Sequence, residues 1–290
     1  DASSTDSGAT DSGATDSGSV DAGTDSGSPD ASMFCTTGDF TTTTTLVGLD
    51  TTDNEFVRSV SPDENVVYFH AKRTGDATVD LWTATRLSAI SGYTSYAKLP
   101  FSSVTEDDSF PAVNADATLV VFARFNAASS SVDLANAGRA TSGASWPSTS
   151  NFIGATPMNE SGPFVSSAGN LYFTYQSQLW VAAANGGGPS TPVLVPGLTT
   201  TTGVSSPVVD STETILYYSV DSGAVGAADI HYATRATTGD PFVPQGIVPL
   251  VNSSANDYAA HLSANGCRLY LTSNRTTGHA FDGFVATRTP

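Results

Sequence analysis

The sequence is poor in charged residues, and the shortage falls mainly on the basic ones. Charged residues make up 13% of the 290 residues, and Lys and Arg number 11 against 28 Asp and Glu. The charged fraction is about half that of an average soluble protein. The net charge of −17 repels phosphate backbones and anionic membranes, so nucleic acid is not expected as a partner. Thr, Ser, Gly and Ala replace the missing charges, which favours a β-rich extracellular protein over a cytosolic enzyme.

Other signals are absent as well. No run of 18 apolar residues occurs, so no transmembrane segment is predicted. The sequence contains neither the G-x-S-x-G turn of serine hydrolases nor the H-E-x-x-H pattern of zinc enzymes. The chain starts at Asp1 rather than at Met, which indicates a processed start, and a lipid anchor would lie before Asp1.

The first 34 residues differ from the rest of the chain. They contain Asp-Ser-Gly four times and hold seven Asp but no basic residue, and their only large apolar side chains are Val20, Met33 and Phe34. Such a segment cannot bury enough apolar surface to offset the entropy cost of ordering. We therefore expect a disordered, acidic, low-complexity tail at 1–34, with a span of about 30 Å, that tethers a folded domain at 35–290.

Internal repeats point to the fold of that domain. Short hydrophobic segments recur at 66–69, 119–122, 171–173, 215–218 and 268–271. Eleven residues after four of these segments an Asp opens a further strand, at Asp80, Asp133, Asp229 and Asp282, and these strands lead to Arg86, Arg139, Arg235 and Arg288. A short strand and a tight turn precede each hydrophobic segment, and a looser strand follows the Arg. Each repeat is thus predicted to form strands a to d of one propeller blade.

The two ends of the domain indicate the number of blades. The last repeat lacks strand d, because only Thr289 and Pro290 follow Arg288. Residues 40–49 precede the first repeat and, like the d strands, begin with an aromatic residue and end in aliphatic ones. We expect this segment to complete the last blade. The predicted fold class is therefore all-β, a five-bladed β-propeller of four-stranded antiparallel blades closed by an N-terminal strand.

The chain has two cysteines, Cys35 and Cys267. Cys35 lies five residues before the expected closing strand, and Cys267 begins strand b of the blade that this strand completes. A single pair of cysteines in a secreted chain favours a bridge. We therefore expect a Cys35–Cys267 disulfide that holds the two ends of the ring together.

Several short motifs resemble known repeats. The turn Ser61-Pro62-Asp63, the b strands ending in Tyr-Phe, and the c strands Asp-Leu-Trp and Asp-Ile-His resemble the WD-like (WD40-like) repeats of TolB-like propellers over about residues 54–290. The tail resembles the spacer that follows the lipidated Cys of bacterial surface lipoproteins. These resemblances imply a bacterial protein that is extracellular or located at the cell surface or in the periplasm, in families whose propellers serve as binding proteins or accompany peptidases.

Acidic residues mark the start of strand a in four of the five repeats, at Glu55, Asp108, Glu160 and Asp257, with Val204 in the remaining one. Asn54, Asn159 and Asn256 directly precede three of these acids. Three interpretations stay open. In the first, the carboxylates accept backbone N–H groups of a neighbouring blade. In the second, they and the Asn oxygens bind a cation such as Ca²⁺ or the basic side chains of a partner, and in the third they are catalytic.

The favoured function is a secreted or surface-tethered binding or scaffolding protein. It would recognise a protein or glycan ligand on the top face of the propeller without catalysis, and its only expected cofactor would be Ca²⁺ at the acidic ring. The alternative is a glycoside hydrolase that uses Glu55, Asp108 and Glu160 in the central funnel, because such enzymes need two carboxyl groups across the scissile bond. Short b-to-c loops that are poor in aromatic residues favour the binding protein.

Overall fold

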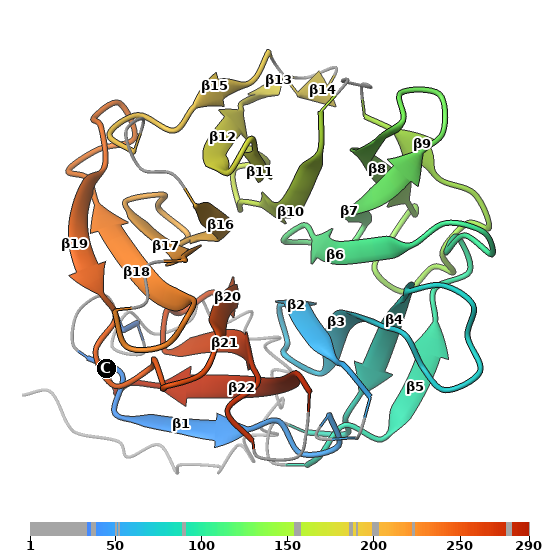
Figure 1. Cartoon of the computed structure of the whole chain (residues 1–290), viewed down its shortest axis with the longest axis horizontal. Helices are drawn as coiled ribbons and strands as arrows, with labels where there is room; N and C mark the ends of the chain where they lie inside the picture. The colour runs from blue at the N-terminus through green and yellow to red at the C-terminus, as the bar shows by residue number, and fades with distance from the viewer. Residues whose placement is uncertain are drawn as a thin grey trace, which may run out of the picture. The chain divides into compact units, whose positions relative to one another are not determined.

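The described part of the chain is built from β-strands. The computed structural model describes residues 34–35, 39–49, 51, 53–88, 91–153, 158–185, 188–189, 191–198, 203–221, 224–276 and 280–289. Within these ranges there is no helix, and hence none that is long and apolar enough to cross a membrane. Five four-stranded antiparallel sheets surround a centre, which confirms the predicted five-bladed propeller (Figure 1). Apart from Phe34, the expected tail lies outside the described residues, and the boundary between tail and domain stays a prediction.

The blades follow one another along the chain, each running from its innermost to its outermost strand (Figure 1). Blade 1 consists of β2 (Phe56–Val60), β3 (Val66–Ala71), β4 (Asp80–Thr85) and β5 (Ser95–Lys98). Blade 2 consists of β6 (Asp108–Val113), β7 (Leu119–Asn126), β8 (Ser131–Gly138) and β9 (Asn151–Phe152). Blade 3 consists of β10 (Glu160–Val165), β11 (Leu171–Tyr175), β12 (Gln178–Ala182) and β15 (Val193–Leu194), with the ribbon β13 (Ala184–Asn185) and β14 (Gly188–Pro189) inserted. Blade 4 consists of β16 (Val204–Val209), β17 (Ile215–Val220), β18 (Asp229–Thr234) and β19 (Val243–Ile247).

Blade 5 joins the two ends of the domain. It contains β20 (Asp257–Leu262), β21 (Arg268–Ser273), β22 (Asp282–Thr287) and, as its outermost strand, β1 (Thr42–Thr45). The pairing of β1 with β22 is antiparallel and runs from Thr42 opposite Thr287 to Thr45 opposite Phe284. The expected closing strand is therefore confirmed, although it is shorter than residues 40–49.

A repeated Arg contact shows why the N-terminal segment fits this place. At the end of strand c an Arg donates its Nε to the carbonyl of a turn residue between strands a and b that has a positive φ. The pairs are Arg86 with Glu64, Arg139 with Ala117, Arg235 with Glu213, and Arg288 with Gly266. Each guanidinium also lies over an aromatic ring that precedes strand d, namely Tyr93, Trp146, Phe242 and Phe40. Phe40 thus takes in blade 5 the position of the d-strand aromatics of the other blades.

Removal of the Phe40 ring is expected to weaken ring closure. Phe40 is 2% exposed and packs edge-to-face against Tyr217 of the neighbouring blade. Phe40→Ala should lower the free energy of unfolding by about 3–5 kcal/mol, because it leaves a cavity under Arg288. Urea denaturation would measure this loss. The exposed Thr44→Ala on the same strand should change stability by less than about 0.5 kcal/mol, and equal effects of the two variants would contradict the packing role of Phe40.

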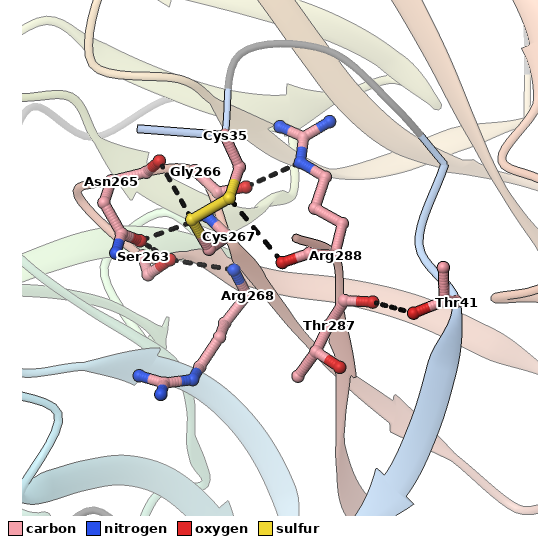
Figure 2. Close-up of a disulfide and its surroundings, with 9 residues drawn as sticks. All are labelled: Cys35, Thr41, Ser263, Asn265, Gly266, Cys267, Arg268, Thr287 and Arg288. Carbon is pink, nitrogen blue, oxygen red and sulfur yellow. Dashed lines mark hydrogen bonds between the residues drawn. A yellow bond between two sulfur atoms is a disulfide. The ribbon is translucent and has the colours of Figure 1, made fainter. Parts of the chain in front are cut away.

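The predicted disulfide is confirmed. Cys35 and Cys267 are bonded across 232 residues of sequence, and the Cys35 backbone N–H donates to the Asn265 carbonyl at 2.8 Å. Figure 2 shows the bridge beside Arg288 and close to the point where Thr41 meets Thr287. The bridge therefore links the segment before β1 to the turn that opens β21.

Candidate functional site

A cavity of about 310 Å³ lies where the five inner strands begin. Each inner strand contributes to its wall, so all five blades border the cavity. Its wall combines four aromatic residues, four hydroxyl residues, one glycine and two basic residues: Phe56, Phe110, Tyr258, Phe281, Ser161, Thr174, Ser205, Ser206, Gly162, Arg58 and His70. None of the described residues that line it is acidic. Its volume falls at the lower end of the range typical of small-molecule sites.

Backbone bulges aim several of these side chains. Every inner strand shifts register against strand b, because it carries an extra residue at the cavity. In β2 the extra residue is Arg58. In the next three blades the bulge contains Phe110, Gly162 and Ser206, whose φ values are +56°, +54° and +54°. Bulges re-aim side chains and are common beside active sites, which suits the position of this cavity.

The predicted acids do not themselves form the wall. Glu55, Glu160 and Asp257 stand directly before a wall residue, and Asp108 stands two residues before Phe110. Glu55, Asp108 and Asp257 are 0% exposed and Glu160 is 5% exposed. The described residues contain no cluster of three or more His, Cys, Asp or Glu side chains that could hold a metal ion. Calcium binding by the four acids and their neighbouring Asn oxygens therefore stays a prediction.

Two of the acids are hydrogen-bonded to arginines of their own blade. The Asp108 carboxylate receives Arg124 Nε at 2.5 Å and Nη2 at 2.7 Å, and it also accepts the Ser103 backbone N–H at 2.7 Å. Asp257 likewise accepts Arg275 Nη2 at 2.6 Å and the Ser253 backbone N–H at 2.6 Å. These contacts match the structural interpretation, in which the carboxylates satisfy backbone N–H groups, although the donors belong largely to the loop before strand a.

The Asn residues of the ring have a similar role. Asn159 Oδ1 accepts the Val132 backbone N–H at 2.8 Å, and Asn256 Oδ1 accepts the Ala228 N–H at 3.1 Å, in each case from the preceding blade. Asn54 is exposed. Thus Asn159 and Asn256 tie neighbouring blades together, and as ligand-binding residues all three stay predictions.

Glu55 has the least compensated environment among the acids whose contacts are described. Its Oε1 accepts a hydrogen bond from Thr51 and lies 3.6 Å from Arg73, whereas its Oε2 is buried without a hydrogen-bond partner. Burial raises the pKa of Glu55 to about 7, outweighing the opposing effects of Thr51 and Arg73. Near neutral pH this carboxyl group can therefore hold a proton. Glu55 directly precedes Phe56, and its backbone N–H donates to the Phe281 carbonyl. Both Phe56 and Phe281 line the cavity, so Glu55 lies next to the cavity wall.

This pKa predicts a pH-dependent stability. The folded protein keeps the Glu55 proton up to about pH 7, whereas the unfolded chain loses it near the ordinary value of 4.5. Between these values the folded state binds more protons, so the free energy of unfolding falls as pH rises, by about 3 kcal/mol in total. Urea denaturation from pH 4 to 8 would measure the difference between wild type and Glu55→Gln, which lacks this group. A constant difference across that range would contradict the raised pKa.

Sequence reasoning missed the wall residues Arg58 and His70. A signal for Arg58 was present, because the equivalent positions of the other inner strands hold Pro111, Pro163, Pro207 and Ala260. Arg58 is thus the one charged residue among the five equivalent positions, which indicates that it has a role the other four do not share. His70 Nδ1 accepts the Phe110 backbone N–H at 3.1 Å, and its ring stacks on Phe56 with centroids 4.7 Å apart.

Several solved structures of glycoside hydrolases share the fold of this chain. A thermostable family-43 glycoside hydrolase superposes with a TM-score of 0.54 at 15% identity, covering 85% of this chain and 92% of the other. The GH43 enzyme from Xanthomonas citri complexed with xylotriose gives 0.55 at 14% identity, covering 84% and 89%. A GH62 hydrolase in complex with xylotriose gives 0.51 at 9% identity, covering 84% and 95%. No family model and no curated protein matches the sequence, so the resemblance to TolB-like propellers stays a prediction.

These similarities overturn the preference for a non-catalytic binding protein. The solved structures above that span most of both chains are hydrolases, which favours the glycoside hydrolase alternative. At 9–15% identity the likeness itself establishes the shared fold alone. The aromatic residues of the cavity come mainly from the inner strands, which supply Phe56, Phe110 and Tyr258, and only Phe281 comes from a b-to-c loop, so aromatic-poor loops do not imply an aromatic-poor cavity.

Proposed function

We propose that the chain is a glycoside hydrolase that binds a xylose-containing glycan at the axial cavity. The observation that carries this proposal is the position of Glu55, a fully buried carboxyl group with a pKa near 7 directly beside a cavity walled by all five blades. Two of the similar glycoside hydrolase structures contain xylotriose, which supports the choice of sugar.

Glu55 is the general acid in this mechanism. Glycoside hydrolysis needs a protonated carboxyl group that delivers its proton to the leaving oxygen, and a raised pKa keeps that proton in place at neutral pH. The Glu55 side chain contacts Thr51 and Arg73. Catalysis therefore requires that the Thr51 contact opens when the sugar enters, as catalytic hydrogen bonds often tighten only in the substrate complex.

The second carboxyl group comes from one of the next two blades. Asp108 and Glu160 begin the next two inner strands, β6 and β10, and both are buried beside wall residues. Arg124 holds Asp108 in one orientation through two hydrogen bonds. The second group either activates a water molecule or attacks the anomeric carbon, and the distance between the two carboxyl groups in the substrate complex decides between these outcomes.

The wall suits a sugar ring. Phe56, Phe110 and Tyr258 offer apolar faces, while Ser161 and Ser205 offer hydroxyl groups near the same cavity. Ligand sites typically combine mostly apolar walls with a few polar groups that fix orientation.

The proposal extends to where the enzyme acts. A disulfide persists in oxidising compartments, which supports action outside the cytoplasm, at the bacterial cell surface, in the periplasm or in the medium. The acidic tail at 1–34 would then tether the propeller to a surface.

The test is hydrolysis of xylotriose and of a panel of chromogenic aryl glycosides by the purified chain. Release of xylose or of the chromophore at a rate that scales with enzyme concentration would support the proposal. A glycan array run in parallel would detect binding without cleavage. Absence of cleavage across the panel, with or without such binding, would overturn the hydrolase assignment.

A further inference from the structure

Arg58 is a buried cation in the cavity wall. It is the extra residue of the bulge in β2, and only 8% of it is exposed. Its guanidinium lies 4.5 Å from the centre of the Phe110 ring and 5.9 Å from that of Tyr258. The bulge and these two rings therefore hold its charge against the cavity rather than in solvent.

No carboxylate of the described residues forms an ion pair with this guanidinium. Nη1 donates to Ser206 Oγ at 2.7 Å and to the Ala259 carbonyl at 3.3 Å, both neutral acceptors. Nε is buried and has no acceptor. By contrast, Arg124 and Arg275 each bind an Asp of their own blade. Arg58 is therefore a buried charge with neutral and aromatic contacts but no described carboxylate partner, in a chain whose net charge is −17.

The charge is present at neutral pH. Burial lowers the pKa of Arg58 to about 10, which leaves the group protonated. A buried charge is costly unless an opposite charge or several hydrogen bonds compensate it. An anion in the cavity would supply what the protein itself does not.

The other wall groups limit the kind of anion. Burial and the nearby Arg58 charge hold the pKa of His70 well below its ordinary value, so Arg58 is the only cation of the described wall. One guanidinium matches one carboxylate, whereas a phosphate dianion would call for a second cation. Thr174 Oγ1 is also buried without a partner, and Thr174 is 8% exposed. The wall thus offers a hydroxyl group and aromatic faces beside the cation, in a space of about 310 Å³.

We propose that Arg58 binds the carboxylate of a uronic acid, so that the cavity accepts an acidic sugar residue of the glycan. This inference rests on the proposed hydrolase function and adds the substrate class to it. The carboxylate would accept from Arg58 Nη2 and, after a shift of the side chain that exposes it, from Nε. A sugar hydroxyl would bond to Thr174 Oγ1 after a similar shift, and the ring would lie against the aromatic wall.

The test measures binding separately from cleavage. D-glucuronate, D-xylose and acetate would be titrated by NMR into the wild type, Arg58→Gln and Arg58→Lys. Arg139→Gln is the matched control, because Arg139 binds the Ala117 carbonyl at the opposite end of the inner strands. Thermal melts would check that each variant is folded.

The wild type should bind glucuronate at least about tenfold more tightly than xylose or acetate, as expected for a charge-assisted hydrogen bond. Arg58→Gln should lose that preference, Arg58→Lys should keep part of it, and Arg139→Gln should keep all of it. If Arg58→Gln fails to fold, the Arg58→Lys variant provides the test. A preference of Arg58→Lys for glucuronate equal to that of the wild type would overturn the contact through two guanidinium nitrogens.

Other outcomes separate the two proposals. Equal affinity for glucuronate and xylose would overturn the anion site, even if xylotriose is cleaved. Acetate that binds as well as glucuronate would show a site for small anions and overturn the sugar-acid assignment. Glucuronate binding through Arg58 without cleavage of any glycan would overturn the hydrolase function and leave the anion site in place.

Discussion

Glu55→Gln is expected to lower kcat for xylotriose hydrolysis by about 10²–10⁴-fold, the range typical of general acid catalysis. Gln keeps the size of the side chain but cannot donate a proton to the leaving oxygen. KM should change little, because the cavity wall itself is unaltered. Steady-state kinetics at several pH values would measure both constants, and the alkaline limb of the wild-type profile should fall near pH 7, where Glu55 loses its proton.

A matched control comes from Glu213, a buried glutamate at the turn between β16 and β17. Glu213 accepts hydrogen bonds from Asn170 and Tyr172, each at 2.9 Å, and forms an ion pair with Arg235. Glu213→Gln should reduce stability but leave kcat per folded molecule unchanged. A fall in kcat of the same size for both variants, or no fall for Glu55→Gln, would remove Glu55 from the mechanism.

Reduction of the Cys35–Cys267 bridge is expected to lower the free energy of unfolding by about 5 kcal/mol, the upper range of chain-entropy estimates for a loop of this length. The bridge spans 232 residues, so its loss frees nearly the whole ring in the unfolded state. Urea denaturation with and without dithiothreitol would measure the change.

The double variant Cys35→Ser with Cys267→Ser provides the control. It should be as unstable as the reduced wild type, and the reductant should have no effect on it, since the sequence holds two cysteines in all. A reduced protein as stable as the oxidised one would mean that β1 and Phe40 alone secure the ring. Two titratable thiols in unreduced protein would contradict the bridge itself.

Much of the fold could be predicted from the sequence because the blades repeat. In four of the five repeats the same spacing separates the b strand from the Asp of strand c, and an Arg follows the end of strand c. The structure explains that Arg through its contacts with a turn carbonyl and an aromatic ring, as in Arg139 with Ala117 and Trp146. Since Phe40 is the equivalent aromatic before β1, the closing strand carried the same signal.

The candidate site was harder to predict, because its contacts cross between segments with no fixed spacing. Nothing in the sequence shows that Asp108 is paired with Arg124, whereas Glu55 keeps one buried oxygen without a partner. The position of Arg58 depends on a bulge, which alters the alternation of side chains along β2. The charges that distinguish the repeats are therefore visible in the sequence, but their pairing is a property of the folded ring.

The pairing of β1 with β22 also sets an order of events during biosynthesis. β1 is synthesised before the five blades but cannot pair until β22 has been synthesised, because Thr42 lies opposite Thr287. Contacts between such distant segments form slowly, and until then the outer edge of β22 is unpaired and open to other chains. A nascent or partly exported chain can build blades 1 to 4 but cannot seal the ring. Truncation after β21 should therefore leave β1 without its partner and yield a protein prone to association.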